Sequence, residues 1–234
     1  MKLSIIIPVY NEESTVAKIL RRVKKAPLPK GISREIIAID DKSKDKSLNI
    51  LSSIAGIKLF THKVNKGKGA CIRTGISNAS GDLLLIQDAD LEYDPNDYPK
   101  LIDPIIAGYA HVVYGTRFRN YPLALFGKMR TPLISHYLGN KFLTFVTNLL
   151  YTNAVTDMET GYKVIKRDVL NGITIKSKRF DFEPEITAKI LKKGYKIYEV
   201  PIKVKPRGYK GGKKITWKDG IIALWTLVKY RFVD

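Results

Sequence analysis

The sequence is poor in cysteine and in negative charge, and it contains no long uncharged apolar run. Cys71 is the only cysteine among 234 residues, which excludes an internal disulfide and suits a reducing compartment. We expect it to be a small buried residue of a helix. No stretch of eighteen uncharged apolar residues occurs, so the pattern predicts no transmembrane helix. The N-terminal segment 1–8 is too short for a signal peptide and predicts a first strand instead.

The shortage of acidic residues leaves a strongly basic chain. There are 22 Asp and Glu against 41 Lys and Arg, which gives a net charge of +19. Such a surface attracts polyanions, namely nucleic acid, anionic lipid or phosphorylated substrates. Hydrophobic content of 44% and charged content of 27% are ordinary for a globular protein. The length suits one large α/β domain, and any second domain must be small.

Two common phosphate-binding signatures are also missing. The first expected strand is followed by residues 8–12, which contain no Gly-x-Gly-x-x-Gly pattern and no P-loop lysine. This speaks against a dinucleotide-binding domain. A weaker candidate is Gly67-Lys68-Gly69 at an expected helix start, where backbone N–H groups and the Lys68 charge could contact phosphate. An ordinary turn explains the same three residues.

Strand and helix patterns alternate through the first half of the chain. This order predicts a parallel sheet with helices on both faces, in which ligands bind beyond the carboxyl ends of the strands. Asp40 and Asp41 follow one strand and Asp88 and Asp90 follow another, so we expect these acids to face one crevice. The expected strands cover 3–9, 35–39, 57–61 and 83–86, and the expected helices cover 14–25, 46–54 and 70–78.

The segment 81–95 is the most informative stretch. A buried strand is followed by Asp88, Asp90 and Glu92 at alternate positions, and Pro95 ends the strand pairing. Alternate side chains of an extended chain project to one side, so we expect the three acids to converge. Like charges that close together need a cation, and oxygen ligands suit Mg²⁺ or Mn²⁺, which would also hold a substrate phosphate. The alternative is a solvated acidic loop.

Several motifs in a fixed order carry a resemblance to a known family. Residues 5–12, 39–43, 65–69 and 88–92 resemble the family-2 inverting glycosyltransferases of the GT-A fold. Within that family, later segments resemble the polyprenyl (dolichyl) phosphate hexose synthases. These later segments are 115–117, 156–163, 182–185, 199–202 and 207–215. The resemblance runs from residue 3 to about residue 231, and its specificity lies in the combined order rather than in one motif.

The resemblance implies that a nucleotide sugar binds at the strand ends. The first motif matches positions that hold the base and the ribose, and Asp41 matches a base-recognising aspartate. The nucleotide-sugar residues expected in this way are Pro8, Tyr10, Glu12, Asp40, Asp41, Lys68, Asp88, Ala89 and Asp90.

The same resemblance implies a metal site. Asp88 and Asp90 match the pair that holds a metal against the donor diphosphate. Glu92 is the expected third ligand, at a position where dolichyl-phosphate mannose synthases commonly carry Gln. Arg207 matches a position near the diphosphate. The metal and Arg207 would together stabilise the negative charge that develops on the leaving diphosphate.

Other matched positions lie near the lipid-phosphate acceptor: Arg117, Arg130 and Ser135. An acceptor phosphate is already ionised at neutral pH, so it needs cationic steering, for which arginine is suited, rather than a strong base. A solvated surface charge is the alternative for each arginine. Asp157 matches an acid near the base and is expected to orient a neighbour rather than remove a proton. The expected catalytic residues are therefore Asp88, Asp90, Asp157, Arg117 and Arg207.

Two apolar stretches, 133–151 and 217–232, bear on location. Each has apolar residues at helical spacing, aromatic residues and basic neighbours, a pattern typical of a helix lying in a membrane interface. The net charge favours an anionic membrane surface. Packing of both stripes on the sheet is the alternative. The three histidines show no metal-ligand spacing and receive no role.

These observations predict an α/β protein of the GT-A, Rossmann-like type, with a mostly parallel sheet flanked by helices. The catalytic domain is expected over 1–212 and a C-terminal amphipathic interface helix over 213–234. The predicted activity is metal-dependent, inverting transfer of a hexose from UDP-glucose or GDP-mannose to a polyprenyl (dolichyl or undecaprenyl) phosphate. The protein is expected to lie peripherally on the cytoplasmic face of the membrane.

Several points stay open at this level: the donor, the lipid, Mg²⁺ or Mn²⁺, the oligomeric state and the pathway. A separate membrane protein that anchors the enzyme or uses its product is left open as a partner, because no transmembrane helices are appended. Two alternative functions remain. The first is a family-2 transferase with a soluble or polysaccharide acceptor. The second is a non-catalytic nucleic-acid-binding protein, which lacks support because no interleaved aromatic and basic sheet motif is present.

Overall fold

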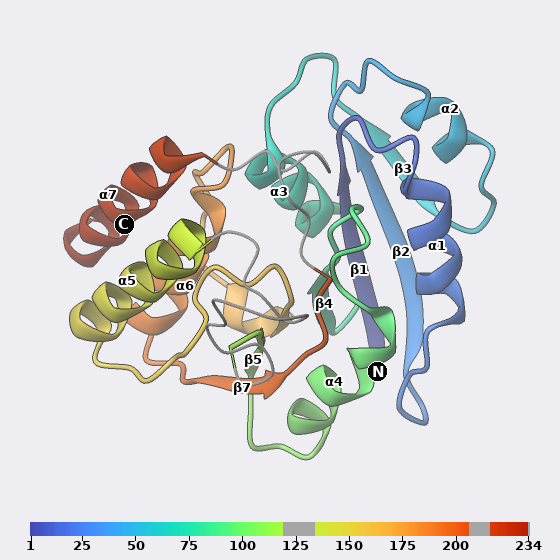
Figure 1. Ribbon diagram of the computed structural model, residues 1–234. Coiled ribbons are helices and arrows are strands. Elements are labelled where there is room, and N and C mark those ends of the chain that lie inside the picture. Colours follow the sequence, from blue (N-terminus) through green and yellow to red (C-terminus); the bar gives the residue numbers. More distant parts are fainter. Residues whose placement is uncertain (119–133, 206–215, 234) are drawn as a thin grey trace.

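The computed structural model describes residues 1–118, 134–205 and 216–233 (Figure 1). Two of the expected site residues, Arg130 and Arg207, lie outside these ranges. Within them the chain alternates strands and helices, and all the strands belong to one sheet.

The helices and strands have the following bounds. The strands are β1 (Lys2–Val9), β2 (Ser33–Asp40), β3 (Lys58–Thr61), β4 (Leu83–Ile86), β5 (Val112–Thr116), β6 (Lys163–Lys166) and β7 (Ile197–Pro201). The α-helices are α1 (Val16–Lys25), α2 (Ser47–Ser52), α3 (Lys68–Asn78), α4 (Tyr98–Ile106), α5 (Ile134–Tyr151), α6 (Phe182–Lys192) and α7 (Trp217–Phe232). Two short 3₁₀ helices, η1 (Pro95–Asp97) and η2 (Arg167–Leu170), complete the set.

The sheet has the strand order β3-β2-β1-β4-β6-β5-β7. β1 runs parallel to β2 and β4, β3 runs parallel to β2, and β7 runs parallel to β5, whereas β6 is antiparallel to both of its neighbours. The expected mostly parallel α/β sheet is therefore confirmed. The antiparallel β6 was not expected, because the pattern of the first half of the chain describes crossovers between parallel strands only.

The inner strand β1 carries a continuous apolar run, residues 5–7, that is buried on both faces of the sheet, as expected for a strand between parallel neighbours. Ile5 and Ile7 belong to the same core cluster as residues of α1 and α4. Ile6 points to the other face, where it packs with Cys71 of α3. A fully buried side chain of this size stabilises the fold by about 1.5–3 kcal/mol. The helices therefore cover both faces of the sheet and hold the strand ends in fixed positions.

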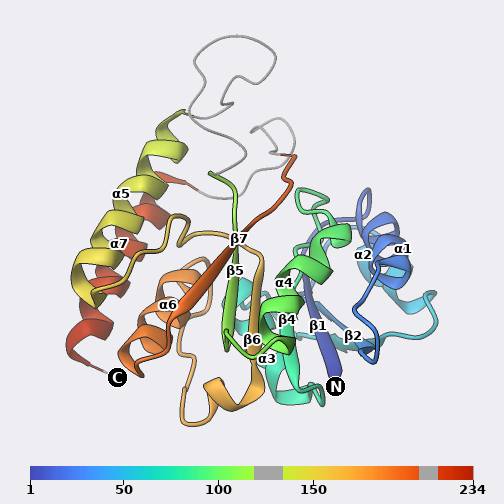
Figure 2. The same cartoon turned by 90° about the horizontal axis from the view of Figure 1, so that it is seen from below.

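Helices α5 and α7 lie side by side at one side of the sheet (Figure 2). They pack together through a small core cluster that includes Leu143 of α5 and Ala223 and Leu227 of α7. The Tyr151 hydroxyl donates a 2.7 Å hydrogen bond to the carbonyl of Leu227, which ties the end of α5 to α7. Each helix thus buries one stripe against its neighbours and leaves another stripe on the outside.

Candidate active site

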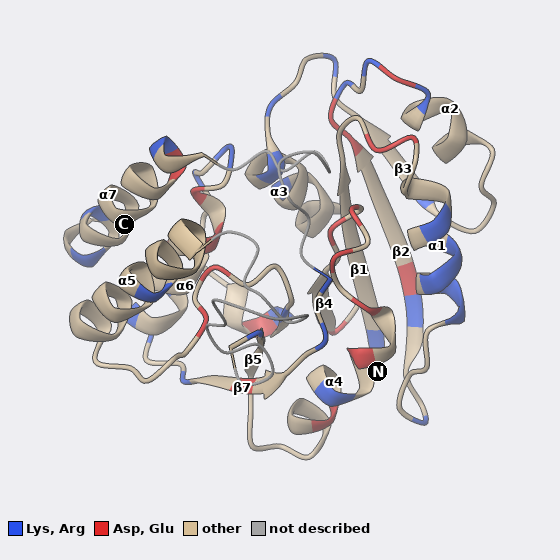
Figure 3. Cartoon of the chain, viewed as in Figure 1, with Lys and Arg blue, Asp and Glu red and all other residues tan. Residues whose placement is uncertain are grey.

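A cavity of about 460 Å³ lies at the carboxyl ends of β1, β2 and β4. Figure 3 shows the acidic segment that follows β4 as red stretches of ribbon beside β1. Most of the site residues expected from the sequence line this cavity: Pro8, Tyr10, Glu12, Asp41, Lys68, Asp88, Ala89, Asp90, Glu92 and Arg117. Loops far apart in the sequence therefore converge on one space, as expected at the ends of a parallel sheet.

Three other expected residues do not line the cavity. Asp40 is buried, and its Oδ2 accepts a 3.1 Å hydrogen bond from the Ser43 N–H, so it shapes the loop after β2. Asp157 is fully buried and contacts the site only through a neighbour. Ser135 is exposed in the first turn of α5.

The acids Asp88, Asp90 and Glu92 reach the cavity from a turn rather than from a continuing strand. β4 ends at Ile86, and Leu91 has a left-handed φ of 64°. The N–H of Glu92 donates to Asp90 Oδ1 at 3.1 Å. Strand alternation was therefore the wrong reason for their convergence: a tight turn brings them together, because an extended chain would carry them away from the sheet.

Lys68, in the first turn of α3, joins two acids across the cavity. Its Nζ lies 2.8 Å from Asp88 Oδ1 and 2.9 Å from Glu183 Oε1. Burial lowers the pKa of Lys68, but the Asp88 and Glu183 carboxylates outweigh burial and hold that pKa above its usual value. Lys68 is therefore charged at any physiological pH and compensates part of the acidic cluster.

The donor set after β4 fits a hard divalent cation. Asp88, Asp90 and Glu92 offer only oxygen atoms, the ligands that Mg²⁺ and Mn²⁺ prefer. The Lys68 ammonium lies 2.8 and 3.1 Å from the two oxygens of Asp88, so this carboxylate already holds a positive charge in the cavity. A metal held by Asp88 would compete with Lys68 for these oxygens, and Lys68 would keep its ion pair with Glu183.

Asp41, after β2, is held by three N–H donors. The N–H groups of Lys66 and Gly67 lie 2.9 and 2.7 Å from its carboxylate oxygens, and His62 Nδ1 lies 2.6 Å from Oδ1. Gly67 has a φ of 90°, which suits glycine and turns its N–H toward Asp41. The loop between β3 and α3 is thus folded around this one carboxylate. Sequence reasoning gave His62 no role, because contacts across the fold leave no spacing signal.

Asp41, His62 and Cys71 bring their ligand atoms within 4.8 Å of one another. Burial, with a smaller contribution from Asp41, raises the pKa of the Cys71 thiol well above its usual value. A protonated thiol is a poor metal ligand, and the Asp41 oxygens already accept several hydrogen bonds. We therefore interpret this cluster as a hydrogen-bonded support for Asp41 rather than as a metal centre. Cys71 is buried in α3, as expected.

Arg117, directly after β5, is fixed by Asp157. Its Nε and Nη2 each lie 2.7 Å from a different oxygen of Asp157, and its backbone N–H donates to the same carboxylate at 3.0 Å. Asn140 of α5 adds a fourth hydrogen bond at 2.9 Å. Burial opposes ionisation of Asp157, but the Arg117 charge and these hydrogen bonds hold its pKa below the usual value. Asp157 is thus placed to orient Arg117.

Two glutamates on the wall of the cavity, the partly buried Glu159 and the buried Glu183, received no role from the sequence. Oε1 of Glu159 and Oε2 of Glu183 have no hydrogen-bond partner among the described residues. Burial, with help from the Glu183 charge, raises the pKa of Glu159, and burial lowers the pKa of nearby Lys163. The available sequence signal was the pair of acidic residues, Glu183 and Glu185, in the first turn of α6.

A family model described as "Glycosyl transferase family 2" matches residues 4–174 of the chain. Among curated proteins, the low-salt glycan biosynthesis hexosyltransferase of Haloferax volcanii is 28% identical over 232 residues, covering 99% of this chain and 53% of that protein. The dolichol-phosphate mannosyltransferase of Pyrococcus furiosus is 29% identical over 206 residues, covering 86% of this chain and 56% of that protein. The chain thus spans little more than half the length of these two relatives.

The fold is also similar to solved structures. A crystal structure of glucosyl-3-phosphoglycerate synthase from Mycobacterium tuberculosis, in complex with Mn²⁺, UDP and glucosyl-3-phosphoglycerate, superposes with a TM-score of 0.74 at 17% sequence identity. The match covers 100% of this chain and 81% of that one. At this identity the similarity establishes the fold.

Proposed function

The chain belongs to glycosyl transferase family 2 and is a glycosyltransferase, and from this premise we propose that it transfers a hexose from a nucleotide sugar to a polyprenyl phosphate. UDP-glucose and GDP-mannose are the proposed donors. The observation that carries the proposal is the cavity itself: oxygen-only carboxylates lie on one wall, and a fixed guanidinium, Arg117, lies on another.

The proposed donor site lies at the ends of β1, β2 and β4. Asp88, Asp90 and Glu92 would hold Mg²⁺ or Mn²⁺, which supplies positive charge against the departing diphosphate. The Mn²⁺ and UDP of the mycobacterial synthase support a divalent metal and a nucleoside diphosphate here. Lys68 adds a second cation beside Asp88. Pro8, Tyr10, Glu12 and Asp41 line the remainder of the cavity, where the base and ribose would lie; Ala89 and the buried Asp40 stay in the proposed donor set.

The proposed acceptor site lies at Arg117. A planar guanidinium binds phosphate through two hydrogen bonds, and Arg117 is preorganised for this because Asp157 fixes its orientation. The reaction needs no general base, because the acceptor phosphate is already ionised. Asp157 is therefore proposed to orient Arg117 rather than to remove a proton. Arg130, Arg207 and Ser135 are proposed to add to the charge and hydrogen bonding around the two phosphates. Transfer would proceed with inversion, from an α-linked donor to a β-linked product.

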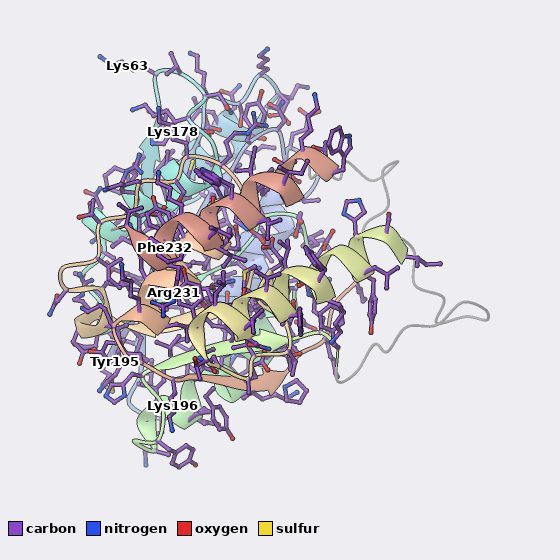
Figure 4. The ribbon with its side chains drawn as sticks, turned by 90° about the vertical axis from the view of Figure 1, so that its left-hand side faces the viewer. Lys63, Lys178, Tyr195, Lys196, Arg231 and Phe232 are labelled. Carbon is purple, nitrogen blue, oxygen red and sulfur yellow. The ribbon has the colours of Figure 1, made fainter. Side chains whose placement is uncertain are left out.

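The outer face of α5 and α7 is proposed to contact the membrane that holds the lipid. Figure 4 views this side, with the two helices side by side and Arg231 and Phe232 labelled near the end of α7. Exposed apolar side chains follow each helix at intervals of three or four residues over much of its length, with Lys218, Lys229 and Arg231 at the ends of α7. The exposed apolar residues are Leu138, Phe142, Phe145 and Leu149 on α5 and Trp217, Ile221, Ile222, Trp225 and Phe232 on α7.

An exposed apolar face of this kind, bordered by basic residues, is suited to an anionic membrane surface. We therefore propose that residues 1–212 form the catalytic domain, with α5 adding to the contact surface, and that residues 213–234 associate with the cytoplasmic face; a separate membrane protein is proposed as a further partner. The Pyrococcus relative is named as a dolichol-phosphate mannosyltransferase, and this name supports a lipid phosphate as the acceptor here. Among the described residues, no helix combines the length and hydrophobicity needed to cross a bilayer.

A second acceptor class has its own support. The mycobacterial enzyme is named as a glucosyl-3-phosphoglycerate synthase, and that name describes a phosphorylated product that is not a polyprenyl lipid. Arg117 would bind such a phosphate equally well. The exposed apolar face of α5 and α7 favours the lipid, because a soluble acceptor needs no such face.

The test is transfer from radiolabelled UDP-glucose and GDP-mannose, in parallel, to a polyprenyl phosphate in detergent with Mg²⁺ or Mn²⁺. Lipid-extractable label from one donor is the expected result. Label in a water-soluble product with none in the lipid would replace the lipid acceptor by the soluble one. Absence of turnover and of nucleotide binding would reject the proposed function.

A further inference from the structure

The hydrogen bonds of Asp41 restrict what else its carboxylate can accept. An ionised carboxylate offers about four acceptor positions, two on each oxygen. On Oδ1, both are taken: His62 Nδ1 lies at 2.6 Å and the N–H of Lys66 at 2.9 Å. Because a carboxylate only accepts, the proton between Asp41 and His62 belongs to Nδ1, while Nε2 lies 3.0 Å from the Thr74 hydroxyl. His62 is therefore a fixed donor.

The second carboxylate oxygen of Asp41, Oδ2, has one acceptor position left for a ligand. Oδ2 accepts the N–H of Gly67 at 2.7 Å. The Cys71 thiol, which lines the cavity, also hydrogen bonds to Asp41, but a thiol is a weak donor and is easily displaced. Asp41 can thus accept one strong hydrogen bond from a ligand N–H group, and only one.

The position of Asp41 fits the base end of a donor. Asp41 follows β2 and Asp88 follows β4, and β1 lies between these strands. Two strand spacings separate them by roughly 10 Å, about the reach from a diphosphate to its base. With the diphosphate at the acids after β4, the base meets Asp41. This step rests on the proposed function.

We propose that the donor base is uracil rather than guanine, and that His62 is the residue that decides between them. Uracil presents a single N–H, at N3, between two carbonyl oxygens, so one acceptor position satisfies it. Guanine presents two parallel N–H groups, at N1 and N2, which bind a carboxylate through both oxygens. With Oδ1 filled by His62 and Lys66, one guanine N–H is left buried without an acceptor, and a site loses affinity for such a ligand.

Binding of UDP and GDP to the full chain in Mn²⁺, measured by titration calorimetry, tests this inference. We expect UDP to bind at least tenfold more tightly than GDP. His62→Leu removes the donor to Oδ1 and should lower the UDP/GDP affinity ratio, because guanine then finds both oxygens. His62→Asn keeps an N–H near Oδ1 and should retain the ratio. Thr74→Val is the matched control, since it leaves the acceptors of Asp41 unchanged and should also retain it.

The ratio separates base selection from general damage, because a loosened fold weakens both nucleotides together. GDP binding as tight as UDP binding in the unaltered protein would overturn the uracil assignment and leave the proposed transfer intact. An unchanged ratio in His62→Leu would overturn the role of His62. If neither nucleotide binds, the proposed donor site, the proposed function and this inference are all rejected.

Discussion

The cavity at the strand ends and the outer face of α5 and α7 both reverse the usual distribution of side chains. At the cavity, charged groups are buried: Asp157, behind Arg117, is fully buried, and Lys68 is largely enclosed. On the outer face, large apolar groups are exposed, with Phe145 at 63% and Trp225 at 65%. Buried charge and exposed apolar area both cost free energy unless something compensates them.

The two regions differ in where the compensation lies. In the cavity it is internal, since Arg117 meets Asp157 and Lys68 meets Asp88 and Glu183. On the outer face, no described residue covers the exposed stripe, and we propose that a membrane surface supplies the compensation. A preorganised site of paired charges is suited to catalysis, and an exposed apolar face is suited to binding another surface. Variants in one region should therefore leave the function of the other intact.

The largest effect is expected for Asp90→Ala. It removes a proposed metal ligand from the cavity and no core packing, so sugar transfer should fall by about 10³-fold or more while thermal unfolding is unchanged. Vesicle binding should also be unchanged. Asp103→Ala, an exposed acid on α4, is the control and should retain full activity. Normal turnover of Asp90→Ala, or of the unaltered protein in metal-free buffer, contradicts the metal site.

Arg117→Lys should lower transfer by about 10- to 100-fold, because an ammonium cannot reproduce two parallel hydrogen bonds. Asp157 then loses at least one of its four hydrogen bonds, which should also lower the melting temperature. Calorimetric titration should show donor binding retained. Arg21→Lys, an exposed arginine on α1, is the matched change. A loss of donor affinity without a loss in the transfer step would move Arg117 out of the acceptor site.

On the outer face, Phe145→Ser and Trp225→Ser should each weaken binding to anionic vesicles by about tenfold, since each removes apolar area from the contact. Nucleotide affinity should not change. Tyr109→Ser removes an aromatic side chain that is 71% exposed elsewhere on the surface and should leave vesicle binding intact. Equal effects of all three changes in a sedimentation assay would mean that hydrophobicity anywhere suffices and that the face is not specific.

Gly161→Ala should raise the donor KM by about five- to tenfold, a smaller effect than loss of a ligand. An added Cβ would lie 2.5 Å from Asp88 Oδ2 and 2.9 Å from the Tyr93 ring, so Asp88 must move. Gly220→Ala on α7 is the control, because its Cβ meets nothing within 4 Å. Unchanged kinetics of Gly161→Ala would show that the position of Asp88 tolerates this displacement.

The smallest effect concerns pH. Burial, with a smaller contribution from Glu183, raises the pKa of Glu159 to about 8. A raised carboxyl pKa means that the folded state holds the proton more tightly than the unfolded state. Its contribution to stability is therefore present below the ordinary carboxyl pKa and is lost as pH rises to about 8. The melting temperature should decline between pH 5 and about pH 8, and Glu159→Gln should reduce that decline. An equal decline in the variant contradicts the assignment.

Much of the fold follows from local patterns in the first half of the chain. The strand at Leu83–Ile86 has the predicted bounds, and α3 begins only two residues before its predicted start. Buried parallel strands are continuously apolar and their helices are amphipathic, so each element is recognisable from its own residues. The antiparallel strand β6 was not predicted, because the strand–helix–strand pattern of the first half of the chain indicates parallel strands only.

The site divides in the same way. The acids after β4 and the arginine after β5 stand beside apolar runs, so their place at strand ends was predictable from sequence. The support of Asp41 by His62 and the pairing of Lys68 with Glu183 join elements that are distant in sequence. The sequence by itself determined the strand ends and the residue types there. Only the tertiary structure decided which side chains meet, because strand order and turn geometry, rather than local periodicity, set the distances between loops.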